Sequence, residues 1–487
     1  MFSAFSAACA QPGTNGATPC VEAPRRPARR VTAVFTAAIV AGGAVAAGAG
    51  AAAAQEDPQN HGGATASLGG LRTHGDAVVR ADGRQQRISA GLFEMVVDNG
   101  GSLLTYCVDL HNPTQKDAKY QETAWSGTSL HANRNSGKIR WILQNSYPQV
   151  NDLGALAKKA GARSLTEEDA AAGTQVAIWR YSDGADVTAT DPDAEKLADY
   201  LQRKARGLAE PKASLALEGA AVSGQPGDRL GPVTVRTNAD SVSVMPPADS
   251  AASGVRVVDG RGKEVTSARD GSKLYLDVPK DAMDGSTALT VQASTTVPVG
   301  RAFTSETRSQ TQILAGSSES TVSATATVGW ASSGAVPALS ARKNCASGGV
   351  DITAVNKGDE DFTFALMGFK YVIEAGKSQT VTVPLQEDQA YDFTVTGPNG
   401  LAKRFKGVLD CKTQGVVPPD DTTTQLASGP EPASVGGTAL DTDLADSGSS
   451  NSTPMIAGVA VALVVLGGAA VFLVRKRKPE SEGSAED

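Results

Sequence analysis

The sequence predicts a multidomain chain with an α+β head, all-β Ig-like sandwich units, a disordered stalk and one transmembrane helix. Three observations predict this class. Residues 65–205 mix strand and helix patterns, residues 206–414 hold short alternating strands, and residues 455–474 are an uncharged apolar run. A chain of 487 residues is long enough for two to four such domains.

The two ends of the chain carry targeting patterns. Residues 1–54 contain "RRPARR", an apolar alanine-rich run and small residues before position 54, which predicts a signal peptide with an N-terminal membrane anchor as the alternative. The apolar helix at 455–474 is followed by "RKRK", which marks residues 475–487 as a cytoplasmic tail. We therefore expect an exported protein held at its C-terminus.

The part outside the membrane divides into four sections. We expect a head at 55–205, a β-sandwich domain at 206–335, an Ig-like β domain at 336–414, and a disordered stalk at 415–454. In the head, "DNGG" predicts a hairpin turn, and helices are expected near 136–147, 164–184 and 191–209. Ser164 and Glu167 have the spacing of a capping box for the second helix.

The charge distribution argues against a nucleic-acid partner. The net charge is −7, and the basic clusters only flank the two apolar runs. Because no domain carries a basic surface that could neutralise phosphates, we expect no binding to DNA or RNA.

The exported part of the chain contains three cysteines, which is an odd number. Cys345 and Cys411 lie at the two ends of the 336–414 unit and are natural disulfide partners in an oxidising compartment. Cys107 is then left without a partner. Such a cysteine can form an intermolecular disulfide, remain a reactive thiol or make another bond, and the simplest alternative is an inert buried thiol. Strand alternation places Cys107 with Thr105 and Asp109, opposite the apolar face.

A cysteine protease or hydrolase is a further alternative for this thiol. The nearest histidine in the sequence is His111, which would lie about 13 Å away along a continuing strand. No local protease signature surrounds Cys107, so this class ranks last among the candidates.

A glutamine is the second unusual residue of the head. Gln175 in "AAAGTQVAIW" falls on the apolar stripe of the predicted helix, where an unpaired amide costs about 1–3 kcal/mol. Taken alone, it could be a helix glutamine bonded to backbone.

Together the two stretches resemble the thioester domains of Gram-positive surface proteins of actinobacterial type. The resemblance covers residues 65–205 and rests on Tyr106-Cys107 and on "TQVAIW" at residues 174–179. It implies a head that is a β-sandwich or barrel with a helical insertion, and an internal thioester between Cys107 and Gln175. Shielding from water would fall to Tyr106, Ile178 and Trp179.

This resemblance also implies a function. The thioester would capture an amine on a surface or matrix protein, giving a covalent adhesin that reacts once, is no enzyme and needs no cofactor or metal. The alternative is an anchored binding protein that acts non-covalently and has an ordinary Cys107 thiol.

The family usually ends in a sortase signal. "LADSG" stands before the apolar helix, with serine where the resemblance leads us to expect threonine, so sortase attachment and a simple membrane anchor both stay open. Its residues are Leu444, Ala445, Asp446, Ser447 and Gly448. Isopeptide bonds between lysine and asparagine are common in such stalks. The β units contain candidate residues such as Lys357 and Asn356, but no spacing in the sequence identifies a bonded pair.

Overall fold

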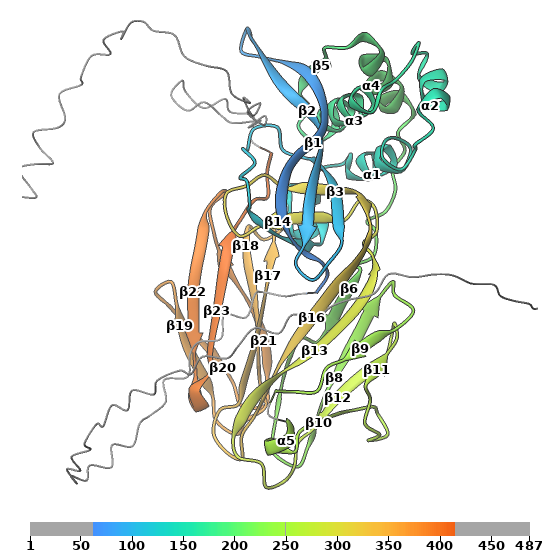
Figure 1. The fold of residues 1–487 in the computed structure, drawn as a ribbon. Helices are drawn as coiled ribbons and strands as arrows, with labels where there is room; N and C mark the ends of the chain where they lie inside the picture. Colours follow the sequence, from blue (N-terminus) through green and yellow to red (C-terminus); the bar gives the residue numbers. More distant parts are fainter. Residues whose placement is uncertain (1–61, 249, 414–487) are drawn as a thin grey trace, which may run out of the picture.

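The computed structural model describes residues 62–248 and 250–413 (Figure 1). The predicted signal peptide, stalk, sorting-like motif at 444–448, membrane helix and tail lie outside these residues. Within the described ranges, no helix is both long and apolar enough to cross a membrane.

The head is built on a sheet of seven strands in the order β2-β3-β15-β14-β4-β1-β5. β1 also pairs with β2, so the sheet closes on itself as a barrel, while β5 extends the outer end of the β1–β2 ribbon (Figure 1). The bounds are β1 (Thr65–Ala81), β2 (Arg84–Val97), β3 (Ser102–Cys107), β4 (Lys119–Thr123), β5 (Asp186–Ala189), β14 (Ala302–Ser305) and β15 (Gln312–Ser317). The predicted hairpin at "DNGG" joins β2 to β3.

Two strands of this barrel come from a distant part of the sequence. β14 and β15 fall inside the segment predicted as a separate sandwich at 206–335, so the boundary at 205 does not enclose the head. The chain leaves the head, forms the sandwich, and returns through the connection between the paired strands β13 and β16. β15 then pairs with β3, and β14 pairs with β4. The head is therefore incomplete without residues 302–317.

Four helices form the rest of the head, at the upper right of Figure 1. They are α1 (Ser136–Gln144), α2 (Leu153–Ala160), α3 (Glu167–Ser182) and α4 (Pro192–Lys204), with short 3-10 turns η1 (Trp125–Gly127) and η2 (Ser129–His131) before them. α3 is buried along most of its length. Its capping box uses Thr166 and Asp169, so the predicted pair Ser164 and Glu167 was wrong by two residues. α2 was not predicted.

The second unit packs two sheets face to face. One has the order β10-β12-β8-β6 and the other β11-β9-β13-β16-β7. Its elements are β6 (Leu215–Glu218), β7 (Ala221–Gly224), β8 (Arg229–Thr237), β9 (Val242–Val244), α5 (Ser250–Ser253), β10 (Arg256–Val258), β11 (Ser267–Ala268), β12 (Lys273–Asp277), β13 (Gly285–Thr296) and β16 (Glu319–Trp330).

The third unit has its own apolar core and three small sheets, β17-β18-β21, β19-β20 and β22-β23. The predicted disulfide between Cys345 and Cys411 is confirmed. The strands are β17 (Pro337–Asn344), β18 (Gly349–Asn356), β19 (Phe362–Leu366), β20 (Phe369–Ile373), β21 (Ser378–Pro384), β22 (Ala390–Thr396) and β23 (Ala402–Val408), with a 3-10 turn η3 (Pro398–Gly400). Its assignment as Ig-like stays a prediction.

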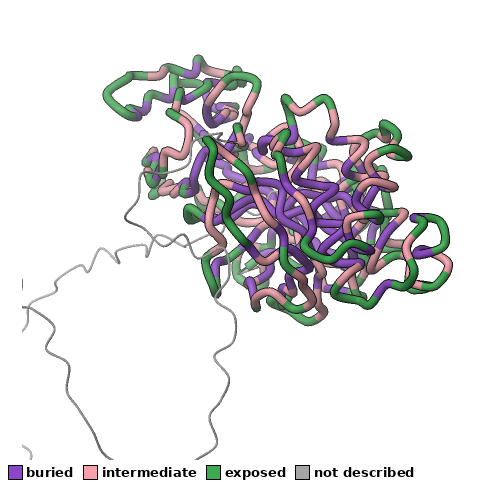
Figure 2. The backbone as a smooth tube through the Cα atoms, turned by 90° about the horizontal axis from the view of Figure 1, so that it is seen from above, coloured by how far each residue is buried: buried purple, intermediate pink, exposed green. Residues whose placement is uncertain are grey.

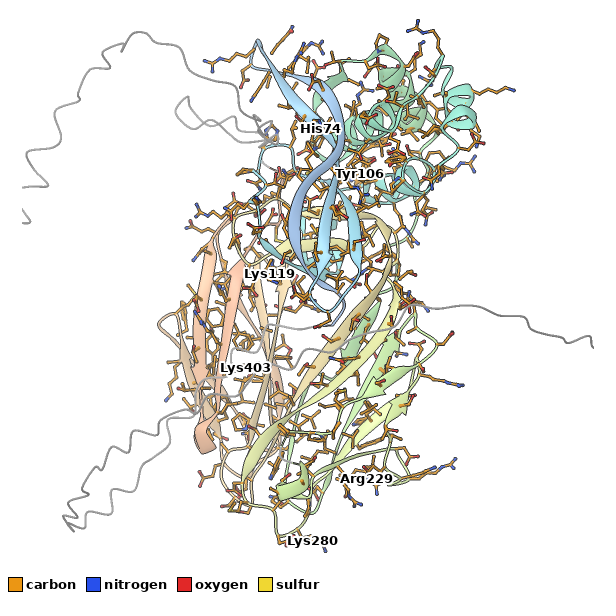
Figure 3. The ribbon with its side chains drawn as sticks, viewed as in Figure 1. His74, Tyr106, Lys119, Arg229, Lys280 and Lys403 are labelled. Atoms are coloured by element: carbon orange, nitrogen blue, oxygen red, sulfur yellow. A yellow bond between two sulfur atoms is a disulfide. The ribbon has the colours of Figure 1, made fainter. Side chains whose placement is uncertain are left out.

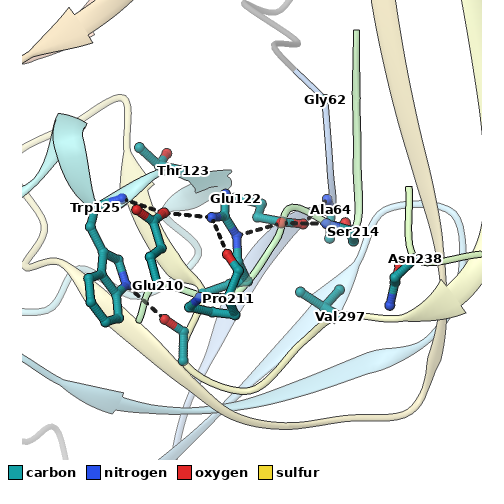
Figure 4. Close-up of polar contacts among 12 residues, drawn as sticks. Gly62, Ala64, Glu122, Thr123, Trp125, Glu210, Pro211, Ser214, Asn238 and Val297 are labelled. Atoms are coloured by element: carbon teal, nitrogen blue, oxygen red, sulfur yellow. Dashed lines mark hydrogen bonds and ion pairs between the residues drawn. The ribbon is translucent and has the colours of Figure 1, made fainter. Parts of the chain in front are cut away.

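A buried ion pair joins the returning segment to the head (Figure 4). Arg301 Nε lies 2.8 Å from Glu122 Oε1, and both side chains are almost fully buried. Nη1 of the same guanidinium lies 2.7 Å from Glu210 Oε1. Glu122 also accepts hydrogen bonds from the backbone of Ala64 and Ser214. The carboxylate therefore ties three distant segments to one barrel strand.

Both faces of β3 are buried, which corrects the expectation that the Cys107 side of the strand lies outside the core. Thr105, Cys107 and Asp109 are all at most 1% exposed. The Tyr106 hydroxyl donates to the Tyr147 carbonyl on the helical side, whereas Cys107 contacts a barrel strand. Figure 2 shows buried segments gathered in the interior of the molecule and exposed ones along its outer loops.

Candidate functional site

Cys107 is the last residue of β3 and lies directly opposite Gln312, the first residue of β15. The next pair, Val108 and Thr311, is joined by a backbone hydrogen bond of 3.2 Å. Hydrogen-bonded pairs alternate with non-hydrogen-bonded ones, so Cys107 and Gln312 form a non-hydrogen-bonded pair, in which facing side chains are closest. Gln312 Nε2 is 3.1 Å from Cys107 Sγ. Among the described residues, Gln312 is the hydrogen-bonding partner of the sulfur.

Gln175, predicted to bond to the sulfur, contacts the backbone of Cys107 instead. Its Oε1 accepts the Cys107 N–H at 3.0 Å, and its Nε2 donates to the Cys107 carbonyl at 2.9 Å. The pairing of β2 with β3 ends at Thr105, which leaves this edge of Cys107 without a strand partner. The helix α3 supplies that partner as a side-chain amide. In this structure the Gln175 amide therefore holds the Cys107 backbone, and its predicted bond to the sulfur stays a prediction.

Gln312 was missed because its position in the sequence gives little sign of the contact. It stands in "TQTQILAG", far from Cys107 and in a different predicted domain. The one available signal was a pair of amides, Gln310 and Gln312, immediately before an apolar run at residues 313–315. Both side chains are buried, at 1% and 0% exposure.

A hydroxyl group holds the Gln312 carbonyl. Thr105 Oγ1 donates to Gln312 Oε1 at 3.0 Å, and both residues are fully buried. A donor on this oxygen polarises the carbonyl and stabilises negative charge that develops on it during nucleophilic attack. Thr105 is thus placed to polarise the carbonyl of the Gln312 amide.

Three buried or half-buried carboxyl groups, those of Asp109, Asp183 and Asp410, lie around the end of β3. The pKa is raised to about 8 for Asp109, about 7 for Asp183 and about 6 for Asp410. Burial is the largest cause for each, and repulsion among these carboxylates adds to the rise for Asp109 and Asp183. Burial also raises the pKa of the Cys107 thiol far above its usual range, although the Gln312 hydrogen bond opposes the rise. The thiol is therefore protonated at neutral pH in this arrangement.

The other residues predicted for the site are buried in the head. Tyr106, Ile178 and Trp179 are each at most 2% exposed (Figure 3 labels Tyr106). Their role as shields of the sulfur stays a prediction. The His111 backbone N–H donates to Asp109, and burial lowers the pKa of its imidazole.

The segment that carries Cys107 and Gln175 matches the model of a known protein family. Residues 104–207 match the thioester domain family. Residues 335–408 match the C-terminal domain of bacterial phospholipase C. The match to the thioester domain ends before β14 and β15, so Gln312 lies outside it. A comparison with the curated proteins gives no match.

Solved structures overlap only loosely with this chain. The Bacillus anthracis TIE protein is 18% identical, with a TM-score of 0.25, over 71% of this chain and 63% of its own length. The thioester domain of the Enterococcus faecium TIE86 protein is 16% identical, with a TM-score of 0.26, over 55% and 97%. The E. coli chaperone DraB is 13% identical, with a TM-score of 0.15, over 40% and 98%. Because these overlaps are slight, the assignment of roles rests on the contacts within this chain.

Proposed function

We propose that Cys107 Sγ and the side-chain carbonyl carbon of Gln312 form an internal thioester, and that the protein is a surface adhesin that captures amine-bearing targets through it. The observation that carries this proposal is the 3.1 Å contact between Cys107 Sγ and Gln312 Nε2. The sulfur already lies against the nitrogen that would leave. The match of residues 104–207 to the thioester domain supports the same chemistry.

Thioester formation replaces the amide nitrogen of Gln312 with the sulfur of Cys107. The sulfur attacks Cδ of Gln312, the Cδ–Nε2 bond breaks, and Nε2 leaves as ammonia with the proton of the thiol. The Thr105 hydroxyl stabilises the oxygen of the tetrahedral intermediate, and Gln175 fixes the backbone from which the sulfur attacks. No group outside the chain is needed to balance this step.

Capture of a target reverses the role of the sulfur. The amine nitrogen attacks Cδ, the S–Cδ bond breaks, and the sulfur takes up a proton that the amine loses. A stable amide on Gln312 and a free Cys107 thiol remain. The protein therefore reacts once and does not turn over, so we propose an adhesin rather than an enzyme, with no cofactor.

Methylamine provides a direct test of the reacting glutamine. After incubation of the full chain with methylamine, proteolysis and mass spectrometry should find the methylamide on Gln312 and an unmodified Gln175. A Cys107→Ala chain should carry no methylamide. A methylamide on Gln175 would contradict the assignment, and none on wild-type protein would favour the non-covalent binding protein with an ordinary thiol.

Surface attachment belongs to the same proposal. The patterns at 1–54 and 455–478 support export and C-terminal anchoring, with sortase processing at "LADSG" as one route. Replacing Ser447 by threonine should raise the wall-bound fraction if sortase acts there. A fraction that stays in the membrane for both proteins would favour the simple spanning anchor.

A further inference from the structure

The end of the third domain contacts the two segments that hold the loop after Cys107. Residues 108–110 are held on one side by Thr311, whose carbonyl accepts the Val108 N–H, and on another by Asp183, whose Oδ1 accepts the Leu110 N–H at 3.1 Å. Residues 409–413, which we call the strap, contact both sides. Asp410 Oδ2 accepts the Thr311 hydroxyl at 2.8 Å, and the Thr413 hydroxyl donates to the Ser182 carbonyl at 3.4 Å.

The reacting groups are closed to solvent in this arrangement. Cys107 is 1% exposed and Gln312 is fully buried, so an amine can reach the carbonyl carbon only if a covering segment moves. β15 and α3 are built into the head core, and their displacement would disrupt the barrel. Leu409, Asp410 and Cys411 of the strap are themselves buried, but the strap forms no strand of the barrel, and among the described residues its side-chain hydrogen bonds to the head are those of Asp410 and Thr413. Because it can separate from the head without breaking a strand pairing of the barrel, the strap is the covering segment that we expect to move.

The disulfide fixes the middle of this strap. Cys411 lies within it, and its partner Cys345 donates its backbone N–H to the Ser126 carbonyl of the head at 3.0 Å. Within its own domain, the strap is held at Leu409, which exchanges backbone hydrogen bonds with residues 388 and 389. Glu387 also accepts the N–H groups of Cys411 and Lys412. The cross-link therefore ties the cover both to the third domain and to a point anchored on the head.

We propose that the strap determines which amines reach the thioester, and that the Cys345–Cys411 disulfide keeps it closed. This inference rests on the proposed function. A small amine reaches Cδ through slight opening of the strap, whereas a lysine side chain on a polypeptide needs the strap displaced. The third domain, remote in sequence, thus contributes the specificity-determining element of the reaction.

The test compares methylamine with a lysine-containing decapeptide as nucleophiles, using the full chain. The variants are Cys345→Ser with Cys411→Ser, and Asp410→Ala with Thr413→Ala, which keeps the disulfide. We expect the peptide rate to rise about tenfold or more in both, and the methylamine rate to rise less, so that the ratio between them shrinks. Thr353→Val is the matched control, because it removes a hydroxyl pair with Thr380 elsewhere in the third domain and should change neither rate.

Three other outcomes would overturn the role of the strap. If the variants keep the mass deficit of the thioester and both rates stay within about twofold of wild type, the strap does not control access. If wild type shows the deficit but both variants lose it, the strap is needed to form the bond, which also overturns the proposal. A wild-type chain without the deficit would refute the proposed function and the strap with it.

Discussion

The side-chain nitrogen of Gln312 lies 3.1 Å from the sulfur of Cys107, across two paired strands that are 205 residues apart in sequence. The intervening chain forms the helices of the head and most of a separate sandwich before it returns as β14 and β15. The proposed reactive pair is therefore brought together by strand pairing over a long distance, and the helix that carries Gln175 contacts the Cys107 backbone from the side.

Loss of the Gln175 amide should weaken both the fold and bond formation. Gln175→Ala leaves the buried N–H and C=O of Cys107 unpaired, so we expect a loss of about 1–3 kcal/mol in the free energy of unfolding. The thioester should still form, but more slowly, because the attacking residue is less well fixed. Denaturant unfolding and intact mass over time measure the two effects.

Gln149→Ala is the control for this change. Gln149 also donates from a side-chain amide to a backbone carbonyl, that of Ala315 on β15, but it does not contact Cys107. It should slow bond formation far less. Complete loss of the bond in Gln175→Ala, with Gln312 unmodified by amines, would return Gln175 to the role of reacting residue.

The Thr105 hydroxyl should contribute to the reaction rate. Thr105→Val keeps the shape of the side chain but removes the donor to Gln312 Oε1, so thioester formation and methylamine addition should each slow by about a hundredfold. Thr105→Ser keeps the hydroxyl and should recover most of the rate. Equal rates for the valine variant and wild type, measured by mass spectrometry after refolding, would exclude this role.

The buried carboxyls should make stability depend on pH. Because the pKa of Asp109 is raised to about 8 by burial, from about 4 when unfolded, the folded chain binds more protons between these values. Its contribution to stability is fully present below about pH 4 and is lost as the pH rises through about 8. Asp109→Asn should therefore reduce the fall in melting temperature between pH 5 and pH 8.

Asp193→Asn serves as the control for that measurement. The pKa of Asp193 is lowered to about 2, chiefly by its hydrogen bond with Lys196, so its titration affects stability only at acidic pH. The variant should leave the change between pH 5 and pH 8 as in wild type. A wild-type melting temperature that rises over this interval, and rises equally in Asp109→Asn, would contradict the expected sign.

The buried pair of Arg301 and Glu122 should hold the returning segment in the head. Arg301→Gln leaves the Glu122 carboxylate buried with only neutral donors, and we expect a loss of about 3–5 kcal/mol in the free energy of unfolding. Arg236→Gln removes an ion pair with Glu218 in which both side chains are exposed and screened by solvent, and should cost far less than Arg301→Gln. Similar losses for the two variants in denaturant unfolding would show that the buried pair has no special role.

Sequence patterns predicted the local features of this site and missed its long-range partner. The hairpin at "DNGG", the helix that carries Gln175 and the disulfide of the third domain each depend on nearby residues or on a small choice of cysteines, and the structure has them. Gln312 was missed because β15 pairs with β3 only after the chain has formed another domain. The same insertion explains why the boundary at 205 cut the head short.

The measurement that tests the central claim most directly is the intact mass of the full chain and of two glutamine variants. If Cys107 and Gln312 are joined, wild type should weigh one ammonia less than its sequence mass, after allowance for the disulfide and signal cleavage. Gln175→Ala should keep that deficit, and Gln312→Ala should lose it and expose an alkylatable thiol on denaturation. A deficit that persists in Gln312→Ala, or a wild-type chain at its full sequence mass, would contradict the account.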